Sequence, residues 1–380
     1  MIRKSLGPLC FTFLSLLFIQ FIFQVDFSFI SSLKSVSEEV EMKDIYFSSI
    51  QRNEKKPIAN IVLIDIDTCK RAQLMDLFKK VQQYQPKVVG VDVLFKEEEP
   101  PSPLQLDYLN YADTSASTVF ACVDSGKNIA HSFFAKDGSK AVEGLVNFGN
   151  TGEGHPIRSI LNKSKSNGNL MSFSAKVASI YNSSLSALKK IKEDTSFNIT
   201  YIPVDFPIEI KAVDIVNDST NAFAQELKNK IVLIGALDSA EDKHKITNAG
   251  YAENDGLYTI ISGLRIHAIA IATLLNDNLI SEPSAFWNHF FTLFVFLLFF
   301  YIFFYLIEYH EFYYELTARL VMLISSILML FFYVLLMKKG IEIELGYLVT
   351  MIIFISGILV LYKPVTHLLK KGWKKLPFNK

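Results

Sequence analysis

Two kinds of hydrophobic pattern alternate along the 380-residue chain: long apolar stretches near its ends and short apolar runs between them. A helix needs about 20 apolar residues to cross the hydrocarbon core of a bilayer. Four stretches reach or approach that length: 6–25, 285–307, 320–337 and 345–362. The first follows Arg3 and Lys4 and lacks the small-residue cleavage site of a signal peptide, so it predicts a signal anchor.

The region between the first and second stretches alternates strand-like and helix-like patterns. Apolar runs at 60–67, 87–95, 117–124 and 231–235 predict strands, and the first two are expected to be covered on both faces. Helical stripes occupy 69–86, 171–182 and 262–280, and an imperfect one covers 33–47. This spacing indicates right-handed crossovers between parallel strands. The predicted fold class is therefore α/β, with a mostly parallel sheet, helices on both faces and a four-helix transmembrane region.

These patterns divide the chain into four predicted parts. They are an N-terminal anchor (1–30), an extracytoplasmic α/β domain (31–284), a three-span bundle (285–362) and a basic cytoplasmic tail (363–380). Arg3, Lys4, Arg319 and the lysines after 362 fall on one side of four spans, which predicts that both termini are cytoplasmic.

Composition and charge limit the classes of partner that we expect for the chain. The 38 basic and 38 acidic residues cancel, and no basic patch is interleaved with aromatics, so nucleic acid is not expected as a partner. No charged residue lies inside an apolar stretch, which disfavours a transporter. The small residues Ser325, Ser326, Ser356 and Gly357 suit close helix packing, either within one bundle or between copies in a homo-oligomer. Cys69 and Cys122 could pair in an oxidising compartment or stay separate thiols.

Several landmarks together resemble a known family. In order they are IVLIDID, QPKVVGVDVLF, VNFGNTGEGHPIRSI, LKNKIVLIGALDSAEDKHKIT and SGLRIHAIAIATLLNDNLI, followed at once by the three spans. This order resembles the second type of the CHASE domain, an extracellular sensory domain associated with bacterial cyclases and histidine kinases. The most specific part is a Gly-x-x-x-His-Ala helix, matched by Gly263, His267 and Ala268.

The resemblance implies a sensory domain that passes a stimulus through the membrane to a cytoplasmic catalytic module. The 363–380 tail is far too short for such a module, so we expect no enzymatic activity on this chain. We expect a bacterial inner-membrane receptor whose partners are the lipid bilayer and a separate membrane or envelope protein. The alternative is a scaffold subunit of an envelope complex that senses nothing.

The candidate ligand-binding residues are carboxylates at strand ends and the cationic or imidazole groups near them. Parallel sheets bind ligands beyond the carboxyl ends of their strands, where Asp65, Asp67, Asp92 and Asp238 fall. Asp67 precedes a helix and is expected to cap it. The predicted ligand-binding set is Asp65, Asp92, Arg158, Asp242 and His267. For Arg158, a structural ion pair is the stronger expectation.

Two more specific hypotheses, phosphate hydrolysis and metal binding, fit the sequence less well. Asp65 and Asp67 resemble the Asp-x-Asp-x-Thr strand end of phosphate-transferring hydrolases, in which the first Asp is the nucleophile. Thr68 comes one place too early for that motif, so hydrolysis by Asp65 is the weakest alternative. Glu241, Asp242, His244 and His267 could offer oxygen and imidazole ligands to zinc. No His-x-x-x-His pair accompanies them, so we predict neither a metal nor a cofactor.

Overall fold

The computed structural model describes residues 2–24, 41–50, 56–57, 60–67, 69, 71–95, 107, 117–125, 128–133, 142–148, 156–161, 163–164, 170–191, 196–201, 204–205, 208–248, 257–281, 283–343 and 345–373. The chain forms two compact units. One is Asp44–Ile280, which we call the domain. The other combines Met1–Lys43 with Ser281–Lys380, and we call it the helical unit.

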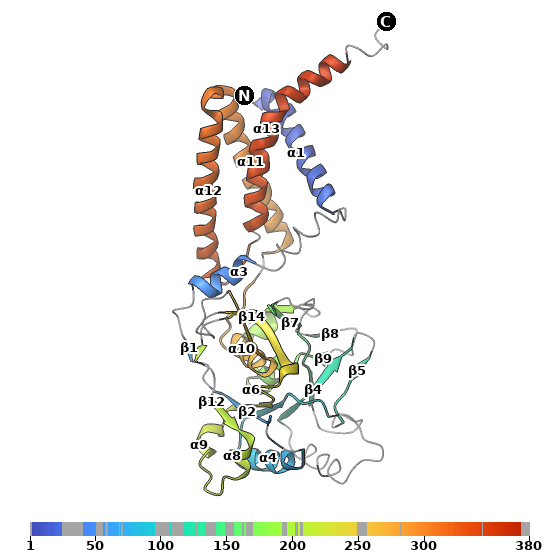
Figure 1. The fold of residues 1–380 in the computed structure, drawn as a ribbon, viewed down its shortest axis with the longest axis vertical. Coiled ribbons are helices and arrows are strands. Elements are labelled where there is room, and N and C mark those ends of the chain that lie inside the picture. The colour runs from blue at the N-terminus through green and yellow to red at the C-terminus, as the bar shows by residue number, and fades with distance from the viewer. Residues whose placement is uncertain are drawn as a thin grey trace. The chain divides into compact units, whose positions relative to one another are not determined.

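The domain is built on a mixed but mostly parallel sheet (Figure 1). Its strands are β2 (Ile61–Asp65), β3 (Val88–Val91), β4 (Thr118–Asp124), β5 (Ile129–Ala130), β6 (Val142–Leu145), β12 (Ile208–Lys211) and β13 (Ile231–Gly235). The order is β12-β2-β13-β3-β4, with β6 parallel and β5 antiparallel to β4. In the pairing of β13 with β2, Gly235 lies opposite Asp65, so the carboxyl ends of the strands share one edge of the sheet.

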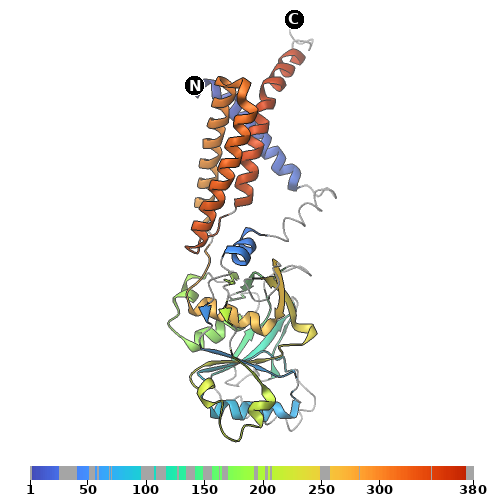
Figure 2. The ribbon, with the colours of Figure 1, turned by 60° about the vertical axis from the view of Figure 1, so that its left-hand side comes forward.

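Helices cover both faces of this sheet (Figures 1 and 2). The α4 helix (Arg71–Gln83) packs with α8 (Ala212–Val216) over one face, and α9 (Ala224–Leu227) contributes Leu227 to the same apolar core. The α6 helix (Phe173–Tyr181) and α10 (Gly263–Leu275) pack together over the other face. Fully buried apolar strands need such cover on both sides. The predicted α/β fold with a mostly parallel sheet is therefore confirmed.

Shorter elements complete the domain. The strands are β1 (Lys56–Pro57), β7 (Ser159–Leu161), β8 (Lys163–Ser164), β9 (Leu170–Met171), β10 (Ser196–Asn198), β11 (Val204–Asp205), β14 (Lys243–Thr247) and β15 (Tyr258–Ser262). The helical pieces are α3 (Met42–Ile45), a π-helical turn (Tyr46–Ile50), α7 (Ser186–Lys190) and a 3-10 turn (Ala240–Asp242). Of the helical stripe predicted over 33–47, only 41–47 falls within the described residues.

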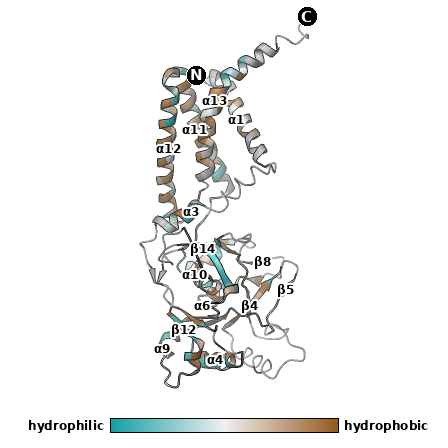
Figure 3. Cartoon of the chain, viewed as in Figure 1, coloured by the Kyte–Doolittle hydropathy of each residue, from teal (hydrophilic) through white to brown (hydrophobic). Residues whose placement is uncertain are grey.

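The helical unit contains α1 (Ile2–Gln24), α11 (Ala285–Tyr309), a 3-10 turn (Glu311–Tyr313), α12 (Tyr314–Met337) and α13 (Leu345–Trp373). The α13 helix packs against each of the other three α-helices. Hydrophobic residues predominate along α11 and α12 (Figure 3). By length and apolar composition, Phe286–Tyr309 and Tyr314–Met337 could each cross a membrane. The described apolar parts of α1 and α13 are shorter, Ser5–Phe18 and Met351–His367, so two of the four predicted spans are supported.

The small residues that suit close helix packing differ in how tightly they are packed. Ser325 and Ser356 are buried inside the helical unit, and the Tyr314 hydroxyl donates to the Ser356 carbonyl at 2.9 Å. A methyl group on Gly357 would meet nothing within 4 Å.

Cys69 and Cys122 are both free thiols, and burial raises the pKa of Cys122 to about 12.

Candidate functional site

The start of α10 is held by a carboxylate from a distant turn. The backbone amide of Gly263 donates to Asp242 Oδ2 at 3.1 Å, and Asp242 Oδ1 lies 3.3 Å from His244 Nε2. The first amides of a helix have no partner within the helix and attract negative charge, which is why a carboxylate suits this position. Gly263 leaves room for this contact, because a Cβ there would lie 2.5 Å from Asp242 Oδ1 and the carboxylate would have to move.

One turn further along α10, His267 is enclosed by aromatic and polar groups. Its side chain is buried, with its Nδ1 2.8 Å from the hydroxyl of Ser174 on α6. The ring of Phe148 stacks on His267 at 4.9 Å and meets the edge of His244 at the same distance. Burial lowers the pKa of His267 to about 4, with the charge of Asp242 opposing this shift, so the imidazole is neutral at neutral pH.

Asp92 approaches the same place from the end of β3. Its backbone amide donates to the Ile234 carbonyl at 2.8 Å, which fixes the residue beside β13. Burial and then the negative charge of Asp242 raise the pKa of Asp92 to about 7, while His244 lowers it. Asp92, Asp242, His244 and His267 therefore form one electrostatically coupled group, which we call the α10 cluster.

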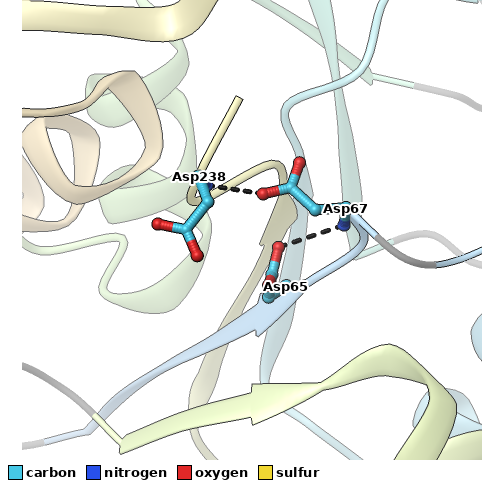
Figure 4. Close-up of side chains that lie close together, drawn as sticks. All are labelled: Asp65, Asp67 and Asp238. Carbon is cyan, nitrogen blue, oxygen red and sulfur yellow. Dashed lines mark hydrogen bonds between the residues drawn. The ribbon is translucent and has the colours of Figure 1, made fainter. Parts of the chain in front are cut away.

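A second group of carboxylates lies at the edge formed by β2 and β13 (Figure 4). Carboxylate oxygens of Asp65, Asp67 and Asp238 lie within 4.8 Å of one another. Asp65 Oδ1 accepts the amides of Asp67 at 3.1 Å and Leu237 at 3.2 Å, and Asp67 Oδ2 accepts the amide of Asp238 at 2.5 Å. These bonds tie the two strand-end loops together, so Asp65 and Asp67 have backbone partners already.

Arg265 is the cation that the sequence did not single out. It makes a two-pronged contact with Glu209 of β12, with Nε to Oε1 at 2.8 Å and Nη2 to Oε2 at 3.0 Å. The charges of Asp238 and Asp65 also act on it. Its place two residues before His267 puts it in the first turn of α10, near the acidic edge. Only the position of β12 at the sheet edge brings Glu209 to it.

Arg158 is engaged in a buried ion pair rather than facing the α10 cluster. Its Nη2 lies 2.7 Å from Asp44 Oδ2, and its Nε contacts both carboxylate oxygens at 3.2 and 3.3 Å. Asp44 also accepts the hydroxyls of Thr247 at 2.5 Å and Tyr258 at 3.1 Å. This network fastens the segment that follows α1 onto the domain, and it agrees with the structural ion pair expected for Arg158.

The five predicted ligand-binding residues thus lie in three separate places in the domain. Asp92, Asp242 and His267 come together in the α10 cluster, Asp65 lies at the acidic edge, and Arg158 pairs with Asp44. The capping role predicted for Asp67 concerns Thr68 and Lys70, which lie outside the described residues.

Phe148 and Ser174 were missed as parts of the site. Only the packing of α6 against α10 and the approach of the segment after β6 bring them to His267. Asp242 directly precedes β14 and His244 lies within it. Because residues two apart in an extended segment point to the same side, this spacing could have indicated that His244 lies beside Asp242.

The fold and this arrangement define an α/β domain placed in sequence between apolar helices, with polar groups gathered at the start of its last helix. Residues 13–306 match the CHASE2 domain family, and the chain belongs to that family of extracellular sensory domains. No curated protein and no solved structure matches the chain.

Replacing Arg158 by Leu should destabilise the domain by about 3–5 kcal/mol, because the buried Asp44 carboxylate would lose its cationic partner. Asp44 is buried, with 1% of its side chain exposed. The measurement is denaturant unfolding of the full chain in detergent. The matched control is Arg265→Leu, which breaks a more exposed two-pronged pair and should cost about 1 kcal/mol or less. Equal losses in the two variants would contradict this assignment.

The α10 cluster predicts a pH dependence of stability with two opposing parts. The pKa of Asp92 is raised to about 7, so its stabilising contribution is full below about pH 4 and is lost as the pH approaches 7. The pKa of His267 is lowered to about 4, so its contribution is full above about pH 6.5 and is lost as the pH falls toward 4.

Asp92→Asn should therefore make the full chain gain stability, relative to the parent, as the pH rises from 4.5 to 7.5. The expected gain is on the order of 3 kcal/mol, from about 1.4 kcal/mol per pKa unit. Thermal unfolding across this pH range measures it. Asp76→Asn, which changes an exposed carboxylate on α4, is the control and should leave the profile unchanged.

Proposed function

We propose that this chain is a receptor-like protein of the bacterial inner membrane. Its extracytoplasmic domain senses a stimulus at the α10 cluster, and the change passes through α10 and the helical unit to a separate protein partner. The convergence of Asp92, Asp242, His244 and His267 on the first turns of α10 carries this proposal. In sequence, α10 is the last helix of the domain and residues 276–284 join it to α11. Membership of the sensory CHASE2 family supports the same role.

A four-span arrangement with both ends of the chain in the cytoplasm is part of this proposal. Exposed aromatic residues flank α11: Phe286, Trp287 and Phe290 at its start, and Tyr305, Tyr309 and Tyr313 toward and beyond its end. Aromatic rings concentrate at both interfaces of a membrane, which supports α11 as a span. The close contact of α1 with α13, where a methyl on Gly7 would lie 2.6 Å from the Tyr362 hydroxyl, supports one shared bundle.

The loop between α12 and α13 holds both segments by which the helical unit joins the domain in sequence. Glu342 pairs with Lys43 at 3.4 Å, and Lys43 directly precedes the first residue of the domain. Ser281, which directly follows the last residue of the domain, donates its amide to the Gly340 carbonyl at 2.8 Å and accepts from the Glu342 amide at 3.1 Å. A change in either connecting segment would therefore reach the turn between two helices of the bundle.

The alternatives receive less support. A scaffold that senses nothing has no need for a charge-coupled group at the start of its last helix. Hydrolysis by Asp65 is disfavoured by the sequence, because Thr68 comes one place too early for the hydrolase motif, and Asp65 Oδ1 holds two backbone amides of the strand-end loops. We therefore assign no catalytic residue to this chain and propose that its output is carried by the partner.

Gly263→Ala tests transmission from the α10 cluster to the helical unit. The added methyl displaces the flexible Asp242 carboxylate from the helix start, since the two would be 2.5 Å apart. In a Trp373→Phe background, Trp287 is the sole tryptophan and reports on the start of α11. For a receptor, we expect Gly263→Ala to change the emission or acrylamide quenching of Trp287 in nanodiscs.

The control is Gly357→Ala, the same chemical change at a position where the methyl meets nothing within 4 Å. This variant should leave the Trp287 signal unaltered. An identical signal in Gly263→Ala and the parent would favour the scaffold instead.

Cysteine labelling tests the proposed topology. In a chain whose Cys10, Cys69 and Cys122 are replaced by Ala, one cysteine is introduced at Asp76 on α4 or at Glu315 on α12. Asp76 is exposed and the Glu315 side chain is 86% exposed, so both sites are accessible in the folded protein. A membrane-impermeant maleimide should label Asp76→Cys in intact spheroplasts and Glu315→Cys only after lysis. Labelling of Glu315→Cys in intact spheroplasts would refute the orientation.

A further inference from the structure

One side of α12 packs against the other helices of the helical unit. Tyr314 and Ala318 belong to one apolar core with residues of α11 and α13, and the Tyr314 hydroxyl donates to the Ser356 carbonyl of α13 at 2.9 Å. The buried residues of α12 are Tyr314, Ala318, Ser325, Tyr333 and Met337. At 3.6 residues per turn they share one side of the helix, which is therefore the side that faces the bundle.

The opposite side of α12 carries a regular apolar repeat, which we call the α12 seam. Its positions are separated alternately by four and three residues, which is the 3.5-residue period of a coiled coil. The seam consists of Leu316, Leu320, Leu323, Ile327, Leu330 and Val334. The first five are between 44% and 64% exposed, so the described part of the chain leaves this side of α12 open.

The residue types of the α12 seam select a two-stranded, parallel pairing. In heptad terms, the three d positions, 316, 323 and 330, are all leucine. Two of the three a positions, Ile327 and Val334, are β-branched, and the third is Leu320. Leucine at d with β-branched residues at a favours a parallel pair of helices. Two copies of one chain inserted in one membrane have the same orientation, so their α12 helices are parallel as well.

Close packing is what such a pair needs inside a membrane. Lipid tails are as apolar as leucine, so burial of apolar surface alone gives two helices little reason to associate there. A 3.5-residue repeat supplies the packing, because each side chain of the seam fits a hole formed by four residues of the facing helix. Ser325 and Ser356, the small residues that could bring helices together, are buried within the bundle. The seam is thus the patterned surface that α12 offers to another helix.

We propose that α12 pairs with α12 of a second copy of this chain along the α12 seam. The two-fold axis of the pair runs along the membrane normal, and each residue of the seam packs against its own counterpart. This inference rests on the membrane crossing of α12 proposed above, and it needs neither the α10 cluster nor a stimulus. The proposed receptor is then a homodimer.

Disulfide cross-linking of the full chain in native membranes tests this pairing. In the background with Cys10, Cys69 and Cys122 replaced by Ala, single cysteines are introduced by Leu323→Cys and Ile327→Cys on the seam. Treatment with a thiol oxidant should give a product of twice the chain mass in both variants, because each new cysteine faces its counterpart. The matched control is Leu328→Cys, which changes an equally exposed leucine next to the seam and should stay monomeric.

Co-purification of two differently tagged copies tests the same contact with the native cysteines in place. The double variant Leu323→Ala and Leu330→Ala, in both copies, should abolish co-purification in mild detergent. The control pair Leu328→Ala and Leu335→Ala removes the same atoms from exposed leucines outside the seam and should preserve it.

The outcomes separate the possible covers of this side of α12. Monomers at both seam positions, which leave lipid as the only cover, overturn the proposal. A cross-linked product with a protein of another mass, or equal cross-linking of Leu323→Cys and Leu328→Cys, overturns it too. Labelling of Glu315→Cys in intact spheroplasts would remove the membrane topology and this pairing together. Seam cysteines that stay monomeric while that labelling requires lysis remove the dimer alone.

Discussion

The insertion of β13 between β2 and β3 is the constraint on which the rest of the domain depends. Every residue of β13 is buried, and the strand pairs in parallel with both neighbours, from Ile231 opposite Ile61 and Val88 to Gly235 opposite Asp65. A parallel strand in this place needs crossover connections and cover on both faces, which the α4 and α10 layers provide. Because β13 lies between β2 and β3, the 236–242 turn that follows it lies at the carboxyl ends of these two strands.

The position of this turn brings together both clusters of polar side chains in the domain, the acidic edge and the α10 cluster. On one side, the amides of Leu237 and Asp238 bind the carboxylates of Asp65 and Asp67, which closes the acidic edge. On the other side, Asp242 reaches the first amide of α10 and approaches Asp92. The two groups differ in what their carboxylates can do. Asp65 and Asp67 at the edge accept backbone amides, whereas burial, and then the charge of Asp242, raises the pKa of Asp92 to about 7.

Consecutive residues of the chain are fastened to different units. Lys43 pairs with Glu342 in the helical unit, and Asp44, the next residue, is bound by Arg158, Thr247 and Tyr258 in the domain. Ser281, which follows the domain in sequence, is held at the same α12–α13 loop as Lys43.

The sequence by itself determined the fold class and the main elements, because apolar periodicity is a local property. The strand runs beginning near Ile61, Val88, Thr118 and Ile231 each became a strand, and the Gly-x-x-x-His-Ala pattern marked α10 and the family. The pattern also placed Asp92 at a strand end, and it named Asp242 and His267 as candidate ligands. It could not show that they meet, nor that Arg158 would be taken up by Asp44. Those outcomes rest on which strands pair and which helices stack, and residues far apart in the chain meet only once tertiary packing has fixed that order. The neutral His267 and the titrating Asp92 are likewise products of tertiary burial, because a pKa depends on the surroundings of a group and not on its place in the sequence.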